Sequence, residues 1–262
     1  MRLNVTESGP QQGVGAPAVV LLHGLFGQSR NFATLREALS DRHRVLALDL
    51  RDHGDSPHAP VEGYGAMAAD VAETLAALGA EGAAVIGHSM GGKVAMRLAL
   101  DHPAALSRLV VSDIAPVPYA PAFRGHAAAM QALPLHPGLT RREADAALAG
   151  AVPEAGVRAF LLQNLDFAAP RWKIGLAEIA AGLPEIEGWE APAGARWDGP
   201  VLVVRGGRSP YVRPEHEPLF TALFPRARFA VVEKAGHWIH AEDPAGFLVA
   251  IRPFLEPGGP AA

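Results

Sequence analysis

The stretch Ala83-Ala84-Val85-Ile86-Gly87-His88-Ser89-Met90-Gly91 runs from a strand-forming segment into a G-x-S-x-G pentapeptide. A helical pattern follows over residues 92–100. This strand–turn–helix context is typical of a nucleophile elbow, in which a strained turn lifts the serine hydroxyl clear of the sheet. Gly87 and Gly91 suit such a turn because it leaves no room for a β-carbon on either side. The pattern predicts that Ser89 is a nucleophile; the alternative is a glycine-rich turn with an idle serine.

Other short apolar runs alternate with helical patterns along the chain. We expect strands at residues 18–22, 44–49, 83–86, 106–112, 200–206 and 228–233. Amphipathic helical spacing is found at residues 32–39, 67–78 and 244–251. Uninterrupted apolar strands between such helices indicate an α/β fold with a mostly parallel sheet covered on both faces. Such a sheet binds ligands beyond the carboxyl ends of its strands. The residues at these ends are His23, Asp49, Ser89 and Asp113.

The alternation of strands and helices breaks at Pro116. From there to about Trp197 the sequence carries helical signals and no convincing strand. We therefore expect a helical cap, residues 116–197, inserted over the carboxyl edge of a core made of residues 1–115 and 198–262. The insertion follows a strand that ends in a candidate site residue, which favours a cap. The alternative is a set of extra helices packed at the side of the sheet.

Two helices of the expected cap have recognisable ends. The segment Thr140-Arg141-Arg142-Glu143 is a capping box, which predicts the start of a helix. Helical spacing over residues 172–179 predicts another helix, which Gly182 and Pro184 are expected to end.

Composition sets limits on the class of protein. The 262 residues favour one large domain with an insertion, and 49% hydrophobic residues are ample for a buried core. A net charge of −4 gives no reason to expect nucleic acid or an anionic membrane as partner. The chain has no cysteine, which excludes disulfides and thiolate ligands. We find no apolar signal core, membrane-spanning run, metal-ligand spacing or phosphate-binding glycine loop, so we expect a cytoplasmic protein without metal or cofactor. The tail at residues 257–262 is predicted to be disordered.

A serine nucleophile needs a base within hydrogen-bond reach. His237 is the best candidate, because it follows the last predicted strand after a glycine and so belongs to a loop at the same sheet edge. His88 lies inside the pentapeptide and is expected to turn inward with a structural part. His23 is expected to brace its own loop, and His240 to be solvated.

The base needs an acid to orient it, and the loop at residues 206–212 lacks one. In most hydrolases of this layout that loop carries an aspartate, whereas here Ser209 stands in its place, and a serine holds no permanent negative charge. Asp113 ends the strand one place earlier and could reach the same histidine. The alternative is that Asp113 caps a turn before Pro116. Poorer candidates for the acid are Asp198, Glu233 and Asp243.

An oxyanion hole is expected beside the nucleophile. One donor should be the backbone N–H of Met90, and the second should come from the glycine-containing loop at residues 23–27. The N–H of Leu25 is the simplest choice and that of Phe26 is the alternative. Such donors stabilise the charge that develops on the attacked carbonyl oxygen.

Other polar and aromatic residues are weaker candidates for substrate contact. Tyr119 and Arg124 begin the expected cap and could face the site, Trp238 adjoins the base, and Phe26 belongs to the oxyanion loop. Each could equally be packing or surface. The polar cluster at residues 49–56 is expected to be a loop brace built from side-chain hydrogen bonds.

With these motifs the chain resembles the α/β hydrolases along essentially its whole length. It is similar in particular to the YbfF-type bacterial esterases. The segments that carry this likeness are residues 22–27, 87–93, 113–116, 206–212 and 236–242. The resemblance implies a triad acid after the earlier strand and a helical cap. It also implies hydrolysis of short- to medium-chain acyl esters, and of acyl thioesters as a further possibility.

The leading hypothesis is a serine carboxylesterase with Ser89, His237 and Asp113 as its triad and a small-molecule acyl ester or thioester as substrate. The same scaffold also supports thioester cleavage, C–C bond hydrolysis, perhydrolysis and lyase reactions. A non-catalytic hydrolase fold that acts as a ligand sensor is the alternative outside enzymes. The sequence leaves the oligomeric state open.

Overall fold

The computed structural model describes residues 1–10 and 17–256, so the tail predicted to be disordered lies outside the described residues. Within these ranges a seven-stranded sheet has the order β1-β3-β2-β4-β5-β8-β9. Its strands are β1 (Val5–Ser8), β2 (Val19–Leu22), β3 (Val45–Leu48), β4 (Ala83–His88), β5 (Leu106–Ser112), β8 (Val201–Gly206) and β9 (Ala227–Val232). Only β1 is antiparallel to its neighbour in this sheet. The predicted α/β class and mostly parallel sheet are therefore confirmed.

The six expected strands are all present in this sheet, and β1 is the one strand of the sheet that the sequence did not predict. β1 pairs with β3 along the edge of the sheet, and its four residues are only partly buried or exposed. A half-buried edge strand needs no continuous apolar run. Val5-Thr6-Glu7-Ser8 contains a single strongly apolar residue, so the hydrophobic pattern carried no signal for it.

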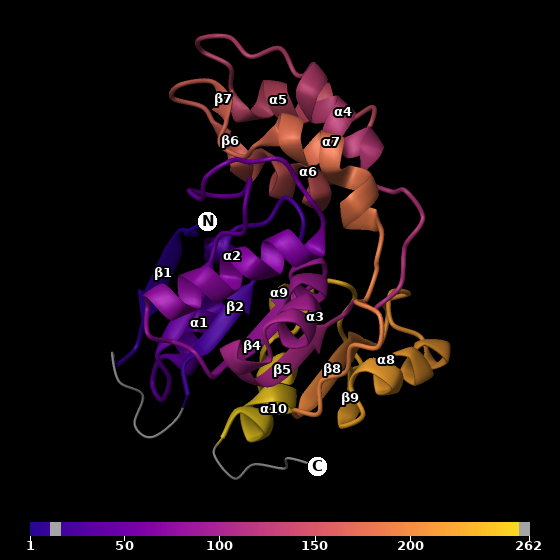
Figure 1. Cartoon of the computed structure of the whole chain (residues 1–262). Helices are drawn as coiled ribbons and strands as arrows, with labels where there is room; N and C mark the ends of the chain where they lie inside the picture. Colours follow the sequence, from indigo (N-terminus) through magenta and orange to yellow (C-terminus); the bar gives the residue numbers. More distant parts are fainter. Residues whose placement is uncertain (11–16, 257–262) are drawn as a thin grey trace.

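Helices cover both faces of the sheet, as Figure 1 shows. α2 (Tyr64–Ala77), α3 (Met90–Asp101) and α8 (Glu217–Leu223) pack on one face, where Val20 and Leu22 enter the core. α1 (Ala33–Leu39) and α10 (Pro244–Leu255) pack on the other, against Val19 and Leu21, and the short α9 (Ile239–Glu242) precedes α10. Alternate residues of one strand thus serve two cores, which explains its continuous apolar sequence. Among the described residues, no helix has the length and apolar character needed to cross a membrane.

The segment between β5 and β8 forms a separate group of helices. Its elements are α4 (Arg124–Ala132), α5 (Arg141–Leu148), α6 (Ala155–Leu161), β6 (Leu165–Asp166), β7 (Arg171–Trp172) and α7 (Leu176–Glu187). A small core of its own includes Leu139, Leu148 and Leu162. In Figure 1 this group lies at the end of the molecule opposite α10 and the C-terminus. We keep the term cap for it, with the bounds 116–197 as our proposal.

The cap differs from the sequence prediction in two ways. It contains a two-stranded hairpin, β6 with β7, and Trp172 lies in β7 rather than in a helix. In addition, α7 continues through Gly182 and Pro184 to Glu187. The side chain of Val61 packs directly on Gly182, where a β-carbon would overlap it, so the glycine permits a close contact instead of ending the helix. The proline removes one backbone donor, but the apolar side chains around it are buried and hold the last turns in place.

The predicted capping box at the start of α5 is confirmed. The backbone N–H of Glu143 donates to the hydroxyl of Thr140 over 3.2 Å, and the N–H of Thr140 donates to the Glu143 carboxylate over 2.9 Å. Two orphan donors of the helix terminus are thereby satisfied by local side chains.

Candidate active site

The pentapeptide forms the turn between β4 and α3. Ser89 has φ 53° and ψ −121°, a strained conformation for a residue with a β-carbon. A β-carbon on Gly87 would overlap the carbonyl oxygen of Gly91, and one on Gly91 would overlap that of Leu22. The turn therefore has the geometry of a nucleophile elbow, and its two glycines are required by backbone contacts on both sides.

Three side chains from distant parts of the chain form a hydrogen-bonded series next to this turn. Ser89 Oγ lies 3.1 Å from His237 Nε2, and His237 Nδ1 lies 2.8 Å from Asp113 Oδ2. A carboxylate only accepts hydrogen bonds, so Nδ1 carries the proton and donates it to Asp113. The unprotonated Nε2 then accepts the hydroxyl proton of Ser89. This arrangement is able to remove a proton from the serine and to stabilise the imidazolium that results.

Asp113 is held rigidly at the end of β5. Its side chain is fully buried, and its backbone has φ 53°. Oδ1 accepts a hydrogen bond from the N–H of Gly206 over 3.0 Å, and Oδ2 accepts one from the hydroxyl of Ser209. The serine that occupies the usual position of the acid is thus a donor to the acid on the neighbouring strand. The turn-capping alternative accounts for neither of these contacts nor for the one to His237.

Two residues outside the series hold His237 in place. His88 Nε2 lies 2.9 Å from the carbonyl oxygen of His237 and donates to it, which agrees with the structural part expected for His88. The ring of Tyr211 stacks on the His237 ring with centroids 4.1 Å apart and an angle of 21° between the planes. Tyr211 was not predicted as a site residue, although it belongs to the same loop as Ser209. An aromatic residue in a loop at the site edge was the available signal.

The two histidines whose rings pack beside His237 and His88, namely His88 and His240, have lowered pKa values. Burial, followed by the neighbouring His240 and His237, holds the pKa of His88 well below its usual range. Burial and the proximity of His237 lower the pKa of His240 to about 4. The expectation that His240 is solvated was wrong: it is 9% exposed and packs between the rings of His88 and Phe32. Its position three residues after His237 turns it back toward the core.

The backbone donors expected for an oxyanion hole are available at Ser89. Neither the N–H of Leu25 nor that of Met90 donates to an acceptor among residues 1–10 and 17–256. The N–H of Phe26, the alternative donor, is already used by His53 Nε2 at 3.0 Å. Asn164 of the cap donates to the carbonyl oxygen of Phe26 over 2.8 Å and so ties the loop to the cap.

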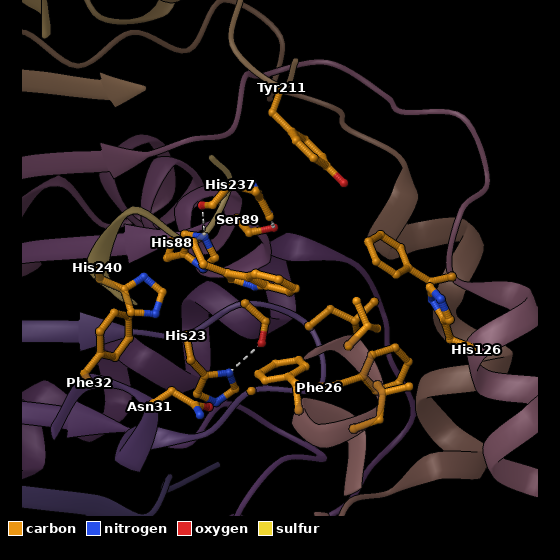
Figure 2. Close-up of a pocket in the computed structure, with 18 residues that line it drawn as sticks. His23, Phe26, Asn31, Phe32, His88, Ser89, His126, Tyr211, His237 and His240 are labelled. Atoms are coloured by element: carbon orange, nitrogen blue, oxygen red, sulfur yellow. Dashed lines mark hydrogen bonds between the residues drawn. The ribbon is translucent and has the colours of Figure 1, made fainter. Parts of the chain in front are cut away.

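A cavity of about 240 Å³ opens at Ser89 between the core and the cap. Figure 2 shows its lining residues, with His237 and Ser89 near one another and His126 on the cap side. Apolar side chains of the cap form much of the wall, among them Val157, Phe160 and Leu161. The placement of these cap residues against Ser89 supports a cap over the site rather than helices at the side of the sheet.

Three of the four residues expected to contact substrate line a cavity at Ser89, and one does not. Phe26 and Trp238 line the 240 Å³ cavity, and Tyr119 lines a second cavity of about 30 Å³, which Ser89 also lines. Arg124 lines neither of them. Its side chain is 61% exposed, and its Nε lies 3.6 Å from the carboxylate of Glu187, so the structure does not support substrate contact by Arg124.

The polar cluster at residues 49–56 is a loop brace, as expected. Asp49 accepts hydrogen bonds from the N–H groups of Ser29 and Asp55 and from the side chain of Asn4. Although burial opposes ionisation, these hydrogen bonds lower the pKa of Asp49. His23 braces its own loop, since Nδ1 donates to the carbonyl oxygen of Gly24 over 2.8 Å.

Comparisons with known proteins agree with this geometry. A family model described as the alpha/beta hydrolase fold matches residues 17–244. The chain is 40% identical over 259 residues to the esterase YbfF of Escherichia coli (strain K12), which covers 97% of this chain and 99% of that protein. It is 42% identical over 249 residues to the sn-1-specific diacylglycerol lipase ABHD11 of Mus musculus, covering 91% of this chain and 81% of that one.

A solved structure described as a marine microorganism esterase superposes with a TM-score of 0.91 at 31% identity, covering 97% of this chain and 100% of that one. The resemblance predicted from the sequence is therefore confirmed at the level of the family. By its fold, by the family model and by these relatives, the chain belongs to the α/β hydrolase family.

Proposed function

We propose that the protein is a serine carboxylesterase that hydrolyses short- to medium-chain acyl esters through an acyl-enzyme intermediate. The observation that carries this proposal is the hydrogen-bonded series from Ser89 through His237 to Asp113, which opens onto a largely apolar cavity. The two relatives named above, an esterase and a diacylglycerol lipase, support esters as the substrate class.

In the first half of the reaction, Ser89 Oγ attacks the ester carbonyl carbon while His237 Nε2 accepts its proton. The N–H groups of Leu25 and Met90 stabilise the oxyanion. Asp113 holds the imidazolium in the correct orientation. The C–O bond to the alcohol then breaks, and the alcohol leaves with the proton from His237.

In the second half, a water molecule gives a proton to His237 Nε2 and attacks the acyl-enzyme. The same two N–H groups stabilise the second oxyanion, the bond to Ser89 breaks, and the proton returns to the serine. No step uses a cofactor. The cofactor independence and the cytoplasmic location expected from the sequence stay predictions.

The alternative functions predicted from the sequence differ in the reaction that Ser89 would carry out. Thioester cleavage uses the same acyl-enzyme chemistry and differs only in the leaving group. A substrate panel distinguishes C–C bond hydrolysis, perhydrolysis and lyase reactions from ester hydrolysis. For each of them, the substrate with the highest turnover would be one other than a simple ester. A ligand sensor would leave Ser89 unreactive toward a fluorophosphonate.

The test is the variant Ser89→Ala, assayed with a chromogenic p-nitrophenyl ester. We expect turnover to fall by roughly 10⁴- to 10⁶-fold with an unchanged circular dichroism spectrum, because removal of one triad member disables the whole series. Ser107→Ala, at an exposed position of β5, is the control and should keep full activity. A folded Ser89→Ala variant with most of its activity would refute the proposal.

A further inference from the structure

Two cavities of very different size meet at Ser89. The larger has a volume of about 240 Å³ and the smaller one of about 30 Å³. Leu25, Ser89, Phe123 and Tyr211 line both of them, so the two cavities adjoin at the nucleophile. An ester bound at Ser89 likewise has two parts, the acyl group and the alcohol, and each part can enter one cavity.

The position of His237 indicates which cavity receives the alcohol. The leaving alcohol oxygen must take its proton from His237 Nε2, and it therefore lies next to that ring in the tetrahedral intermediate. His237 lines the larger cavity and is absent from the lining of the smaller one. Met90, whose N–H is an expected oxyanion donor, lines the smaller cavity only. With the leaving oxygen on the side of the larger cavity, the smaller cavity is left for the acyl substituent.

We propose that the acyl group occupies the smaller cavity and the alcohol occupies the larger one. The substrate class is then an ester whose acyl group comes from the short end of the proposed range and whose alcohol is larger and apolar. This inference rests on the proposed esterase function and assigns the two sides of its substrate.

The size of the smaller cavity sets the limit on the acyl group. Its volume is about one eighth of that of the larger cavity, so it has room for far fewer atoms. Acetyl and propionyl groups place the fewest atoms beyond the carbonyl carbon and therefore fit it best. A hexanoyl chain would have to displace Ile114 or Ile186, which are both buried in its wall.

Two polar side chains of the smaller cavity already have hydrogen-bond partners within the protein. Lys93 Nζ donates to the carbonyl oxygen of Gly188 over 2.6 Å. The hydroxyl of Tyr119 donates to the carbonyl oxygen of Tyr211 over 2.8 Å. Glu187 also lines this cavity, and its Oε1 accepts hydrogen bonds from the N–H groups of Ala122 and Phe123. The smaller cavity therefore suits a neutral acyl group without polar substituents.

The larger cavity suits an apolar alcohol. Val157, Phe160 and Leu161 of α6 form one wall, and Trp238 adds an aromatic side chain 5.9 Å from the Phe160 ring, measured between centroids. Apolar side chains of this kind gain free energy from every methylene that they remove from water. Lengthening the alcohol should therefore be tolerated far better than lengthening the acyl group.

The test compares hexyl acetate with ethyl hexanoate, two isomers that differ in which side of the ester is long. Acid release is followed by titration at constant pH. We expect kcat/KM for hexyl acetate to exceed that for ethyl hexanoate by about tenfold or more. Equal values, or a preference for ethyl hexanoate, would overturn the assignment while leaving the esterase proposal intact. If neither ester nor any p-nitrophenyl ester is hydrolysed, the esterase proposal itself fails.

A variant tests the wall of the smaller cavity directly. Ile186→Ala should raise kcat/KM for ethyl hexanoate by about tenfold and so narrow the ratio between the isomers. Val249→Ala, at a position 76% exposed on α10, is the control and should leave both rates unchanged. A folded Ile186→Ala variant with the wild-type ratio would count against the assignment. If this variant does not fold, the comparison of the two isomers with the wild-type protein still tests the assignment of the acyl group to the smaller cavity.

Discussion

At the scale of single residues, the acid of the proposed triad follows β5, whereas most hydrolases of this layout carry it after β8. β5 and β8 are parallel neighbours, with Ser112 opposite Val204. Their carboxyl ends are therefore adjacent, and a carboxylate at the end of either strand reaches the same histidine. Asp113 supplies it here, and Ser209 on the loop after β8 stabilises the carboxylate as a hydrogen-bond donor. Asp113 can therefore replace the aspartate that the loop after β8 lacks, because it lies at the adjacent strand end.

Lys93 is the least expected charged residue of the core. Its side chain is 1% exposed, and burial lowers its pKa to about 7. The ammonium lies over the rings of Tyr64 and Tyr119, at 5.4 Å and 4.9 Å from their centroids. It also connects the first turns of α3 to the end of the cap through the carbonyl oxygen of Gly188.

The depressed pKa of Lys93 predicts a pH dependence of stability. The unfolded chain binds this proton below about pH 10.5, whereas the folded protein binds it only below about pH 7. Between these values the unfolded state carries more protons, so the free energy of unfolding rises from pH 7 to pH 10. The contribution of Lys93 is on the order of 1–4 kcal/mol. The measurement is urea denaturation at both pH values for the wild type and Lys93→Met.

The comparison between the two proteins isolates this contribution. The N-terminal amine of Met1 has a raised pKa, through its hydrogen bonds to Asp70 and Glu73, and so its contribution falls over the same range. Because Met1 is present in both proteins, only the difference between them reports on Lys93. An equal change with pH in both proteins would contradict the argument.

At the scale of secondary-structure elements, the nucleophile elbow depends on a close approach of two backbones. A β-carbon on Gly91 would overlap the carbonyl oxygens of Leu22 and His23 at the end of β2. We therefore expect Gly91→Ala to lower the free energy of unfolding by about 3 kcal/mol and to abolish most of the esterase activity. Thermal denaturation and the p-nitrophenyl ester assay measure the two effects.

A matched control for Gly91→Ala is available on α6. A β-carbon on Gly156 meets no atom within 4 Å among the described residues, and the position is exposed. Gly156→Ala should therefore leave activity unchanged and stabilise the protein by about 0.4–1 kcal/mol. Equal stability losses in the two variants would show that the crowding at the elbow is not the cause.

The elements that could be predicted are those with a strong local signal. A continuous apolar run such as Val19–Leu22 is diagnostic because both of its faces are buried. β1 has one exposed edge and only a weak pattern, and the hairpin of β6 and β7 has two residues in each strand. The end of α7 was predicted too early because the packing of Val61 on Gly182 involves residues far apart in the sequence.

At the scale of the whole molecule, the site joins two layers that the sequence separates widely. The proposed core supplies Ser89, Asp113 and His237, and residues of the proposed cap line the cavity at Ser89. The three candidate residues could be predicted because each follows a strand end, and parallel strands bring those ends to one edge. The stacking of Tyr211 on His237 could not, since it depends on the path of a loop across that edge.

The central claim is that Asp113 is the acid of the triad, and a single substitution tests it. Asp113→Asn keeps the shape of the side chain but removes the charge that stabilises the protonated His237. We expect kcat on a p-nitrophenyl ester to fall by about 10³- to 10⁴-fold. Asp198→Asn, at an exposed aspartate paired with Arg196, should retain wild-type activity. Equal kcat values for the two variants, both folded, would contradict the account.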